Sequence, residues 1–591
     1  MNPTETIRKM MGWCQNAAIL NCYRYPKFRD ILIALSLFAF AFFIRLYGGV
    51  WDTQVANAAY MSRQAEYIYS YGHPAVPDPF SSAPLYQPGM AYLLAFAGKL
   101  FDIIPINFGM SSMTLAEGVL PPFLGAATVI VIFWLGSRLY NWKAGLLSGV
   151  FASVSSFLLM RTMKGFTFHD ALSLFLITLT IVLVVKALDI LQNPLPEKKK
   201  EKIIYLFWIL LPAISIGLTG FSWGGYFVIH AILILYILLI SLHYFATKRA
   251  LYPFSSFLTL IIITLILGTI LSSILYPVRN FEEITRAMQM MGYASRPIVY
   301  MFTADLQPPG LQSLEMFFGK YLILGIIILV FGLYSLYLKN NGYGLLLISA
   351  VGISMILGLT RSHFMDIFSI FGYVSIGIGF IAVIDLAAKL DSRKRIAIQL
   401  LTILAAILLF SSIAGPSIDS IKFSRLSNDY PGIGNADMMK GYSYIRNNTA
   451  PDALIINWWD YGNDIGYRAQ RRTVIDQMYI EDPDVINVSK IIMGTNRTEG
   501  LQIARNFKSK YNNSEVYLLI GKFDGIIAFV IESCSMEGKE VFYNINQTDH
   551  IEAMTPAASE TNYYKLWTNQ TMDGYDIVYA NKEMKLFKLN I

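Results

Sequence analysis

The chain has 591 residues, of which 55% are hydrophobic and only 15% charged, and its mean hydropathy is +0.47. This balance excludes a wholly soluble globular protein. The formal net charge of +7 is carried largely by Lys and Arg beside apolar runs, so no nucleic-acid partner is needed to explain it.

Apolar runs of about eighteen residues or more recur along the first 415 residues, each long enough to cross a bilayer core of about 30 Å. They predict eleven spans, at 31–50, 118–139, 144–161, 171–191, 204–222, 225–243, 254–276, 319–338, 342–360, 364–387 and 396–415. The region 204–276 is crowded enough to contain two further short helices. The basic segment 1–30 lacks a small-residue cleavage site, so we expect no cleavable signal peptide.

Cations between the spans predict the orientation. Lys and Arg gather before the first span and in the loops that contain Lys198–Lys200, Lys248–Arg249, Lys339 and Arg393–Arg395. The positive-inside rule makes these segments cytoplasmic. The exterior face then receives the loops 51–117 and 277–318, which belong to a membrane domain 31–415, and a soluble domain 416–591.

The predicted exterior domain contains all six N-x-S/T sequons of the chain, as a glycosylated exterior domain would, although an Asn- and Thr-rich composition explains them equally well. They begin at Asn447, Asn487, Asn496, Asn512, Asn546 and Asn569. Cys534 is the only cysteine of this domain, so no disulfide can form within it.

Apolar strands alternate with helical segments in the same domain, which predicts an α/β layer. We expect helices near 436–446 and 463–470 and strands at 453–456, 473–475, 516–520 and 526–531. Ligands of α/β layers bind beyond the carboxyl end of a strand. The pentapeptide Trp458-Trp459-Asp460-Tyr461-Gly462 falls there, and its side chains can form a polar pocket with stiff aromatic walls. An aromatic corner at the end of a core strand is the alternative.

The run from Asn448 to Gly462 resembles the catalytic subunit of oligosaccharyltransferase, and the archaeal single-subunit form matches the chain in length and style. The resemblance covers essentially the whole chain. It implies a polytopic α-helical membrane domain of the GT-C type, with about 11–13 transmembrane helices, and a C-terminal exterior mixed α/β domain.

The activity that the resemblance implies is a dolichyl-(di)phosphooligosaccharide–protein glycotransferase. Such an enzyme moves an oligosaccharide en bloc from a dolichyl (polyprenyl) phosphate or diphosphate to the Asn side-chain nitrogen of an N-x-S/T sequon. The expected partners are the lipid-linked oligosaccharide, an acceptor polypeptide and membrane lipids, without obligatory subunits. The expected location is the cell membrane.

In that family, residues corresponding to Trp458, Trp459, Asp460, Tyr461 and Gly462 hold the +2 Ser/Thr hydroxyl of the acceptor. A carboxylate and two indole N–H groups can bind one hydroxyl, and a substrate without it leaves them unpaired. A D-x-x-K-x-x-M helix contacts the same acceptor residue. Here Lys490 and Met493 have the family's spacing, with Asn487 in place of the leading Asp, although a solvated helix face has the same pattern.

The chemistry requires carboxylates at the acceptor amide and a divalent cation on the phosphate oxygens. Asp52, directly after the first span, occupies the position of the family's essential acid, and Asp305 falls near its T/S-V-x-E element. The alternative for Asp52 is a solvated Asp at the membrane interface. The alternative for Asp305 is a loop Asp that begins a Pro-rich turn.

Asp52, Asp170 and His169 are the expected ligands of Mn²⁺ or Mg²⁺. The family's pattern here is D-x-(D/E/H), and its first acid falls on Phe168. Either the remaining ligands suffice together with substrate phosphate, or the metal affinity is poor.

Arg361 and His169 are expected to contact the phosphate of the carrier, since a guanidinium suits phosphate oxygens. The alternative for Arg361 is an arginine that anchors a helix end at the membrane interface. Another GT-C enzyme, such as a protein mannosyltransferase, and a catalytically impaired family member remain open. A transporter is disfavoured, because the notable acids lie at span ends.

Overall fold

The computed structural model describes residues 28–49, 56–82, 86–104, 109–192, 196, 198–248, 254–276, 308–426, 436–478, 482–522 and 558–591. The predicted strand 526–531, the sequon at Asn546 and the candidate site residues Asp52 and Asp305 lie outside these ranges.

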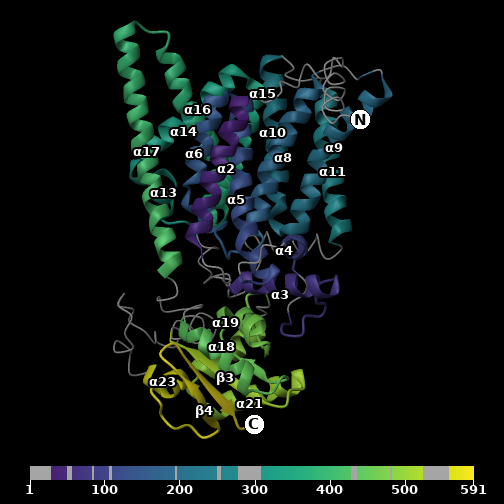
Figure 1. The fold of residues 1–591 in the computed structure, drawn as a ribbon, viewed down its shortest axis with the longest axis vertical. Helices are drawn as coiled ribbons and strands as arrows, with labels where there is room; N and C mark the ends of the chain where they lie inside the picture. The colour runs from purple at the N-terminus through teal and green to yellow at the C-terminus, as the bar shows by residue number, and fades with distance from the viewer. Residues whose placement is uncertain are drawn as a thin grey trace.

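Long apolar helices form one bundle, and the C-terminal part of the chain lies beyond one end of it (Figure 1). Within the described ranges, ten helical segments are long and apolar enough to cross a membrane. The helices in them are α2 (Phe28–Gly48), α5 (Ser112–Leu139), α8 (Asp170–Leu191), α9 (Lys199–Ser222), α10 (Phe227–Thr247), α11 (Phe254–Leu275), α14 (Leu322–Lys339), α15 (Asn341–Thr360), α16 (Met365–Ala387) and α17 (Ser392–Leu426). They correspond to ten of the eleven predicted spans, and the predicted boundary at 415/416 falls within α17.

The prediction of one continuous span at 144–161 is wrong. Residues 142–160 form two shorter helices, α6 (Trp142–Ser153) and α7 (Ser156–Met160), with a break at Val154 and Ser155. Side chains from other helices take the carbonyls at the break: Arg45 donates to Ser153 O at 3.3 Å, and Ser417 donates to Val154 O. The predicted crowding at 204–276 resolves into the three long helices α9, α10 and α11, and the only further helix there among the described residues is the single 3-10 turn η2 (Gly224–Tyr226) between α9 and α10.

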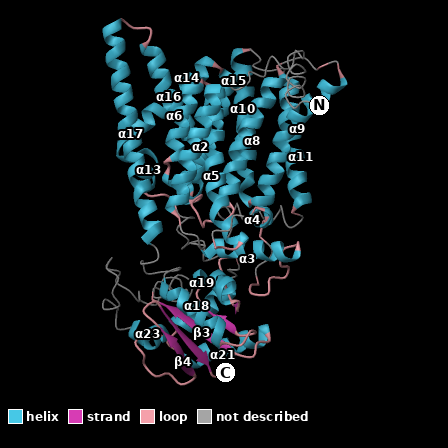
Figure 2. Cartoon of the chain, in the orientation of Figure 1, coloured by secondary structure: helices cyan, strands magenta, loops and turns pink. Residues whose placement is uncertain are grey.

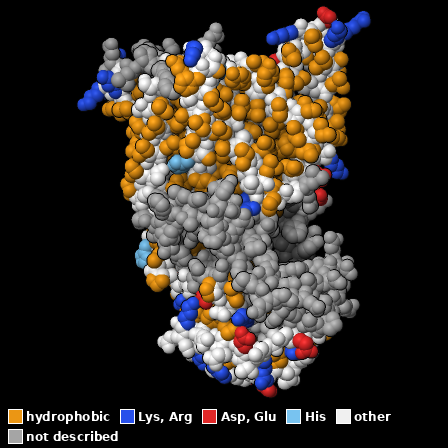
Figure 3. Space-filling model, turned by 180° about the vertical axis from the view of Figure 1, so that it is seen from behind, with side chains coloured by type: hydrophobic (Ala, Val, Ile, Leu, Met, Phe, Trp, Pro, Cys, Tyr) orange, Lys and Arg blue, Asp and Glu red, His pale blue; other side chains and the backbone are white. Residues whose placement is uncertain are grey.

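The outside of the bundle is a broad apolar band (Figure 3). Lys and Arg gather along the edge of this band that is distant from the C-terminal part of the chain. The interior is packed with aromatic side chains such as Phe133, Phe151 and Phe371, which are at most 1% exposed. This is the pattern of a multi-pass membrane protein, whose apolar outer surface replaces the polar surface of a soluble domain.

Two helices of the first long loop lie between the bundle and the C-terminal domain: α3 (Ala56–Tyr71) and α4 (Gly89–Ile103) (Figures 1 and 2). We call the end of the bundle next to them the domain-side end. A short helix, α13 (Leu311–Phe318), and the turn η5 (Gly319–Tyr321) precede α14.

The C-terminal domain is built on a five-stranded mixed sheet in the order β2-β1-β3-β5-β4. Strands β1 (Leu454–Ile456), β2 (Arg472–Thr473) and β3 (Val516–Gly521) are parallel, whereas β4 (Tyr575–Ala580) and β5 (Met584–Leu589) are antiparallel to their neighbours. The helices of this domain are α18 (Ala436–Asn448), α19 (Trp459–Asp464), α20 (Asp482–Met493), α21 (Arg497–Tyr511) and α23 (Asn562–Trp567). The predicted mixed α/β domain is confirmed.

The predicted helix near 463–470 begins earlier than expected. Trp458 is extended, and its carbonyl accepts a bond from Tyr461 N at 3.1 Å, so α19 starts at Trp459 and the pentapeptide is a first helical turn rather than a loop. A π-helical segment, η7 (Ile465–Ala469), continues it and ends at Gln470, whose φ is 53°. Of the expected strand 473–475, only Thr473 lies in a strand, as the last residue of the two-residue β2.

Candidate active site

The pentapeptide lies at the carboxyl end of the central strand β1, where the sequence predicts a binding site. The strand is wholly apolar and buried. β2 and β3 flank its two edges, and helices cover the faces of the sheet. Directly after it, the buried Asn457 donates to Trp458 O at 2.7 Å and to Ile475 O at 3.2 Å. These bonds tie the start of α19 to the segment that follows β2.

Asp460 lies in the first turn of α19 and is half-buried. Burial raises the pKa of its carboxyl group to about 6, and hydrogen bonds from Gln477 and Trp458 only partly oppose the rise. The two indole rings beside it, Trp458 and Trp459, meet edge to face at 6.1 Å. A buried carboxylate near aromatic rings can accept a hydrogen bond from a hydroxyl group strongly, because little water competes.

Gly462 is required by close packing rather than by a turn. A Cβ at this position would lie 2.4 Å from Ile475 O and 2.5 Å from Asp476 Cβ. Tyr461 is buried, and its ring fits against the backbone of Gly521 at the end of β3. The pentapeptide therefore sits where β1, β3 and the chain after β2 meet.

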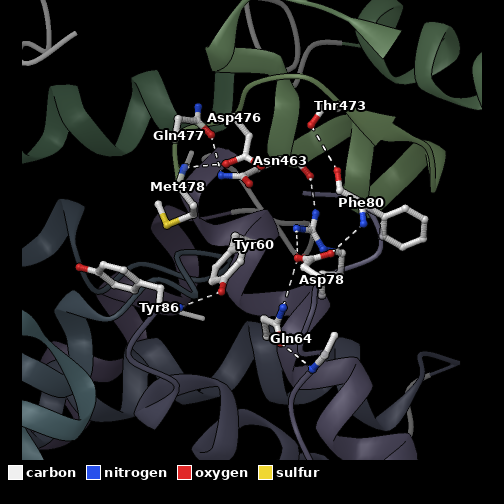
Figure 4. Close-up of polar contacts among 12 residues, drawn as sticks. Tyr60, Gln64, Asp78, Phe80, Tyr86, Asn463, Thr473, Asp476, Gln477 and Met478 are labelled. Atoms are coloured by element: carbon white, nitrogen blue, oxygen red, sulfur yellow. Dashed lines mark hydrogen bonds and ion pairs between the residues drawn. The ribbon is translucent and has the colours of Figure 1, made fainter. Parts of the chain in front are cut away.

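The first long loop binds this region of the domain through a buried polar network (Figure 4). Arg63 of α3 pairs with Asp78 at 2.5 Å and donates to Asn463 O at 3.4 Å, at the end of α19. Asn463 in turn donates to Gln477 at 2.7 Å, and Gln477 donates to the carbonyl of Asp460 at 2.9 Å. The network links α3 to the backbone of the pentapeptide in three steps.

Two further contacts extend this network. Thr473 N of β2 donates to Phe80 O at 3.1 Å, which fastens the first loop to the edge of the sheet. Tyr60 of α3 accepts a bond from Tyr86 N at 3.1 Å, and the ring of Tyr86 lies 5.5 Å from that of His169. The loop thus contacts both the pentapeptide region and the domain-side end of the bundle.

His169, Asp170 and His363 form the one cluster of potential metal ligands found among the described residues. One ligand atom from each lies within 4.8 Å of the others. The Nε2 atoms of the two histidines are 3.8 Å and 3.9 Å from Asp170 Oδ1. His169 and Asp170 are at the start of α8, and His363 is in the short helix η6 (Ser362–Phe364) between α15 and α16.

Aromatic rings enclose this cluster. Trp223 stacks on His169 at 5.9 Å with an interplanar angle of 18°, and its ring is 5.7 Å from that of His363. Phe168 packs against Tyr86 at 6.0 Å and is buried. The donor atoms therefore lie mostly among aromatic rings, with the Arg161 guanidinium beside His363.

The described residues on either side of segment 50–55 contact the loop that leads into α8. Gly49 approaches it so closely that a Cβ would lie 2.0 Å from Lys164 O. Thr167 donates to Ala58 O at 3.1 Å. Asp52 itself lies outside the described residues, as does Asp305.

The other predicted site residues that the structure describes belong neither to the pentapeptide nor to the cluster of His169, Asp170 and His363. Arg361 is buried at the end of α15, two residues from His363, and donates to Thr360 O at 2.9 Å. In α20, Lys490 is exposed and 3.5 Å from Glu499. Met493 is 3% exposed and belongs to the same core cluster as Trp458 and Tyr461.

Sequence reasoning missed His363 and the pair Arg63–Asp78. His363 is two residues from the predicted Arg361. A search for metal ligands in the short turn between the spans 342–360 and 364–387 could have found it. No local pattern marks Arg63 or Asp78, because their pairing depends on how α3 docks.

The architecture is that of the GT-C class of membrane transferases: a helical membrane bundle with loop helices, on which a C-terminal domain rests. The family model described as "Oligosaccharyl transferase STT3, N-terminal" matches residues 31–414, and the one described as "STT3/PglB/AglB core domain" matches residues 451–584. The chain therefore belongs to the STT3 family of oligosaccharyl transferases.

Relatives and solved structures agree with this assignment. A dolichyl-phosphooligosaccharide-protein glycotransferase 2 of Pyrococcus horikoshii is 22% identical over 446 residues, which is 64% of this chain and 56% of that protein. The chain thus matches about half the length of this curated relative. The oligosaccharyltransferase AglB of Archaeoglobus fulgidus, solved with an inhibitory peptide and a dolichol-phosphate, superposes with a TM-score of 0.73 at 15% identity, covering 94% of this chain and 80% of that one. ArnT of Cupriavidus metallidurans has a TM-score of 0.50 at 11% identity, with 94% and 97% covered.

Proposed function

We propose that this protein transfers an oligosaccharide en bloc from a dolichyl phosphate or diphosphate to the side-chain nitrogen of Asn in N-x-S/T sequons. In this step the Asn nitrogen forms a bond to the first sugar carbon, the bond from that carbon to the phosphate oxygen breaks, and the nitrogen loses a proton. Family membership supports the reaction, and the observation that carries the proposal is the position of the pentapeptide. Its half-buried carboxylate lies at a strand end that α3 ties to the side of the bundle holding His169 and Asp170.

Trp458, Trp459, Asp460, Tyr461 and Gly462 would bind the acceptor sequon. The Asp460 carboxylate would accept a bond from the Ser/Thr hydroxyl, and the indole N–H groups would donate to it. Lys490 and Met493 are proposed to support this pocket from α20, with Met493 acting through the core because it is buried.

Asp52 and Asp305 are proposed to hold the acceptor amide, and Asp52 also to ligate a divalent cation. Gly49 and Ala58 are described residues close to Asp52 in the sequence, and both contact the loop that ends at His169. His169 and Asp170 would hold the cation, which when bound neutralises charge on the leaving phosphate. Both ring nitrogens of His169 are buried without a hydrogen-bond partner among the described residues, so the donor set fits a cation.

Arg361 is proposed to bind the carrier phosphate from the domain-side end, with His169 as a second contact. We propose Mn²⁺ or Mg²⁺ as the ion from the family resemblance, the cell membrane as the location, and an exterior position for domain 416–591. Membrane lipids would surround bundle 31–415, with the loops 51–117 and 277–318 outside. We expect neither obligatory subunits nor nucleic acid as partners.

The test incubates the purified full chain with a dolichyl-linked oligosaccharide and a labelled peptide containing N-x-T, with and without a chelator. We expect transfer that the chelator abolishes and that falls at least about a hundredfold with a matched N-x-A peptide, because the pocket's polar groups then stay unpaired. Asp52→Ala should abolish transfer as well. Equal transfer to the N-x-A peptide would remove the acceptor role of the pentapeptide.

A further inference from the structure

We propose that His363 replaces the carboxylate that is missing at Phe168, so that His169, Asp170 and His363 supply two imidazoles and one carboxylate to the metal ion. The donor set of these side chains favours a late transition-metal ion such as Zn²⁺ or Co²⁺ over Mg²⁺. The inference deepens the proposed function, on which the ion's catalytic use rests. The site itself is assessed by metal binding without any substrate.

The spacing of the three side chains fits one ion. Ligands at about 2.0–2.2 Å from a tetrahedral ion lie about 3.3–3.6 Å from one another. The Nε2 atoms of His169 and His363 are 3.8 Å and 3.9 Å from Asp170 Oδ1, and all three ligand atoms lie within 4.8 Å of one another, so side-chain shifts of up to about one ångström would complete the geometry.

The environment of His169 indicates a missing partner. The side chain is 3% exposed, and neither ring nitrogen has a hydrogen-bond partner among the described residues. Leaving a buried polar atom without a partner is unfavourable, because the atom has lost its hydrogen bonds to water. A metal ion would satisfy one nitrogen and thereby account for a polar ring between Trp223 and Phe168.

Phe168 cannot serve as a ligand, and its ring is committed to packing. It is 7% exposed and stacks on Tyr86 at 6.0 Å with an interplanar angle of 14°. The position that the family's pattern gives to an acid therefore carries no donor atom here. His363 supplies one from another helix, across the pocket from Phe168.

The neighbours of His363 are compatible with ligation through Nε2. Arg161 Nη2 is 3.5 Å from Nδ1 of this ring, at the outer limit of a hydrogen bond. When Nε2 binds a metal, Nδ1 carries the proton, and this contact with Arg161 gives way. The guanidinium keeps its other partner, Asp366 Oδ2, at 3.2 Å, which also offsets its charge near the cation.

The ligand types decide which ion the site prefers. Imidazole nitrogen suits Zn²⁺ and other late transition-metal ions such as Co²⁺, whereas Mg²⁺ and Mn²⁺ suit oxygen ligands and Mg²⁺ retains water. For such a set the affinity should rise from Mn²⁺ to Co²⁺, with Zn²⁺ also tight. A site with the family's carboxylate in place of His363 would show weaker discrimination against Mg²⁺.

The test titrates metal-free full-length protein in detergent with Co²⁺, follows its d–d absorption, and then measures competition by Zn²⁺, Mn²⁺ and Mg²⁺. His363→Ala should lower the Co²⁺ affinity at least about tenfold and change the spectrum, since even outer-shell changes cost about 10–100-fold. The matched control is His73→Ala, which removes an exposed histidine outside the cluster.

The double variant F168D/H363A restores a carboxylate and should recover the affinity while moving the preference toward Mg²⁺. Thermal unfolding without metal checks that each variant folds, and His363→Gln replaces His363→Ala if it does not. Wild-type Co²⁺ affinity and spectrum in the His363 variant would overturn the proposal. So would a loss of affinity that Asp at position 168 does not recover. A protein that binds metal as expected but transfers no sugar would instead contradict the proposed function alone.

Discussion

The Asp460 carboxylate, which we propose binds the acceptor hydroxyl, lowers the stability of the fold at neutral pH. Its pKa is raised to about 6 by burial, from an ordinary value of 3.8. A carboxyl group whose pKa is raised on folding stabilises the fold while it is protonated, below about pH 4, and this contribution is lost as the pH rises through about 6. At neutral pH the folded protein therefore carries a desolvated charge that a neutral amide would not have.

We predict that Asp460→Asn stabilises the full chain at pH 7 by roughly 1–3 kcal/mol, and that this gain disappears near pH 4. The same variant should bind an N-x-T peptide at least about tenfold more weakly, because a hydrogen bond to a charged acceptor is stronger than one to an amide. Thermal unfolding at both pH values and peptide titration measure the two effects. Unchanged stability at pH 7 would show that Asp460 is not desolvated as described.

At the scale of elements, α3 places the pentapeptide relative to the bundle. The Arg63–Asp78 pair is almost fully buried, with side chains 9% and 3% exposed. Arg63 also fits closely on η7, because a Cβ at Gly466 would lie 2.2 Å from its Nη1 atom. Such a pair cannot be broken cheaply, since the partner left behind is a buried, uncompensated charge.

We predict that Arg63→Met loosens the contact between the first loop and the sheet, at a cost of about 3–5 kcal/mol. Hydrogen exchange of Thr473 N–H, which donates to Phe80 O, should become faster, and transfer activity should fall together with it. Glu66→Gln is the matched control, because it alters an exposed contact between α3 and η7, the 3.4 Å bond from Tyr467, and leaves the Arg63–Asp78 pair intact. If Thr473 is equally protected in both variants, the pair does not hold the loop.

At the scale of the whole molecule, the distribution of cations agrees with one orientation. Lys339 and Arg393–Arg395 lie at the opposite end of their helices from the domain-side end, which carries Arg361 and the His169 cluster (Figures 1 and 3). From this distribution the positive-inside rule predicts that the C-terminal domain lies outside.

We predict that a membrane-impermeant maleimide labels Asp573→Cys in intact cells but labels Lys394→Cys only after permeabilisation. Both positions are exposed, and the side chain of Asp573 is 87% exposed. The native Cys14, Cys22 and Cys534 are first replaced by Ser. Labelling of position 394 alone in intact cells would reverse the orientation.

Several features were predictable from the sequence because they depend on local physics. Apolar run length predicted ten of the membrane helices, since crossing a bilayer requires a set number of apolar residues whatever the neighbours are. The buried strand before Trp458, and the position of the pentapeptide at its carboxyl end, followed from a short apolar run and the topology of α/β layers. The pentapeptide was recognisable because two adjacent tryptophans followed by a carboxylate, a phenol and a glycine seldom occur together by chance.

Other features depend on contacts between distant segments, and only the tertiary structure decided them. The break at Val154 depends on side chains from α2 and α17 that bind its carbonyl and that of Ser153. The antiparallel strands β4 and β5 complete a sheet whose other strands are parallel. His363 joins His169 and Asp170 although about two hundred residues separate them in the chain, because the start of α8 and the turn after α15 meet at one end of the bundle. Hydropathy and spacing carry no information about such a meeting, since it results from the packing of whole helices.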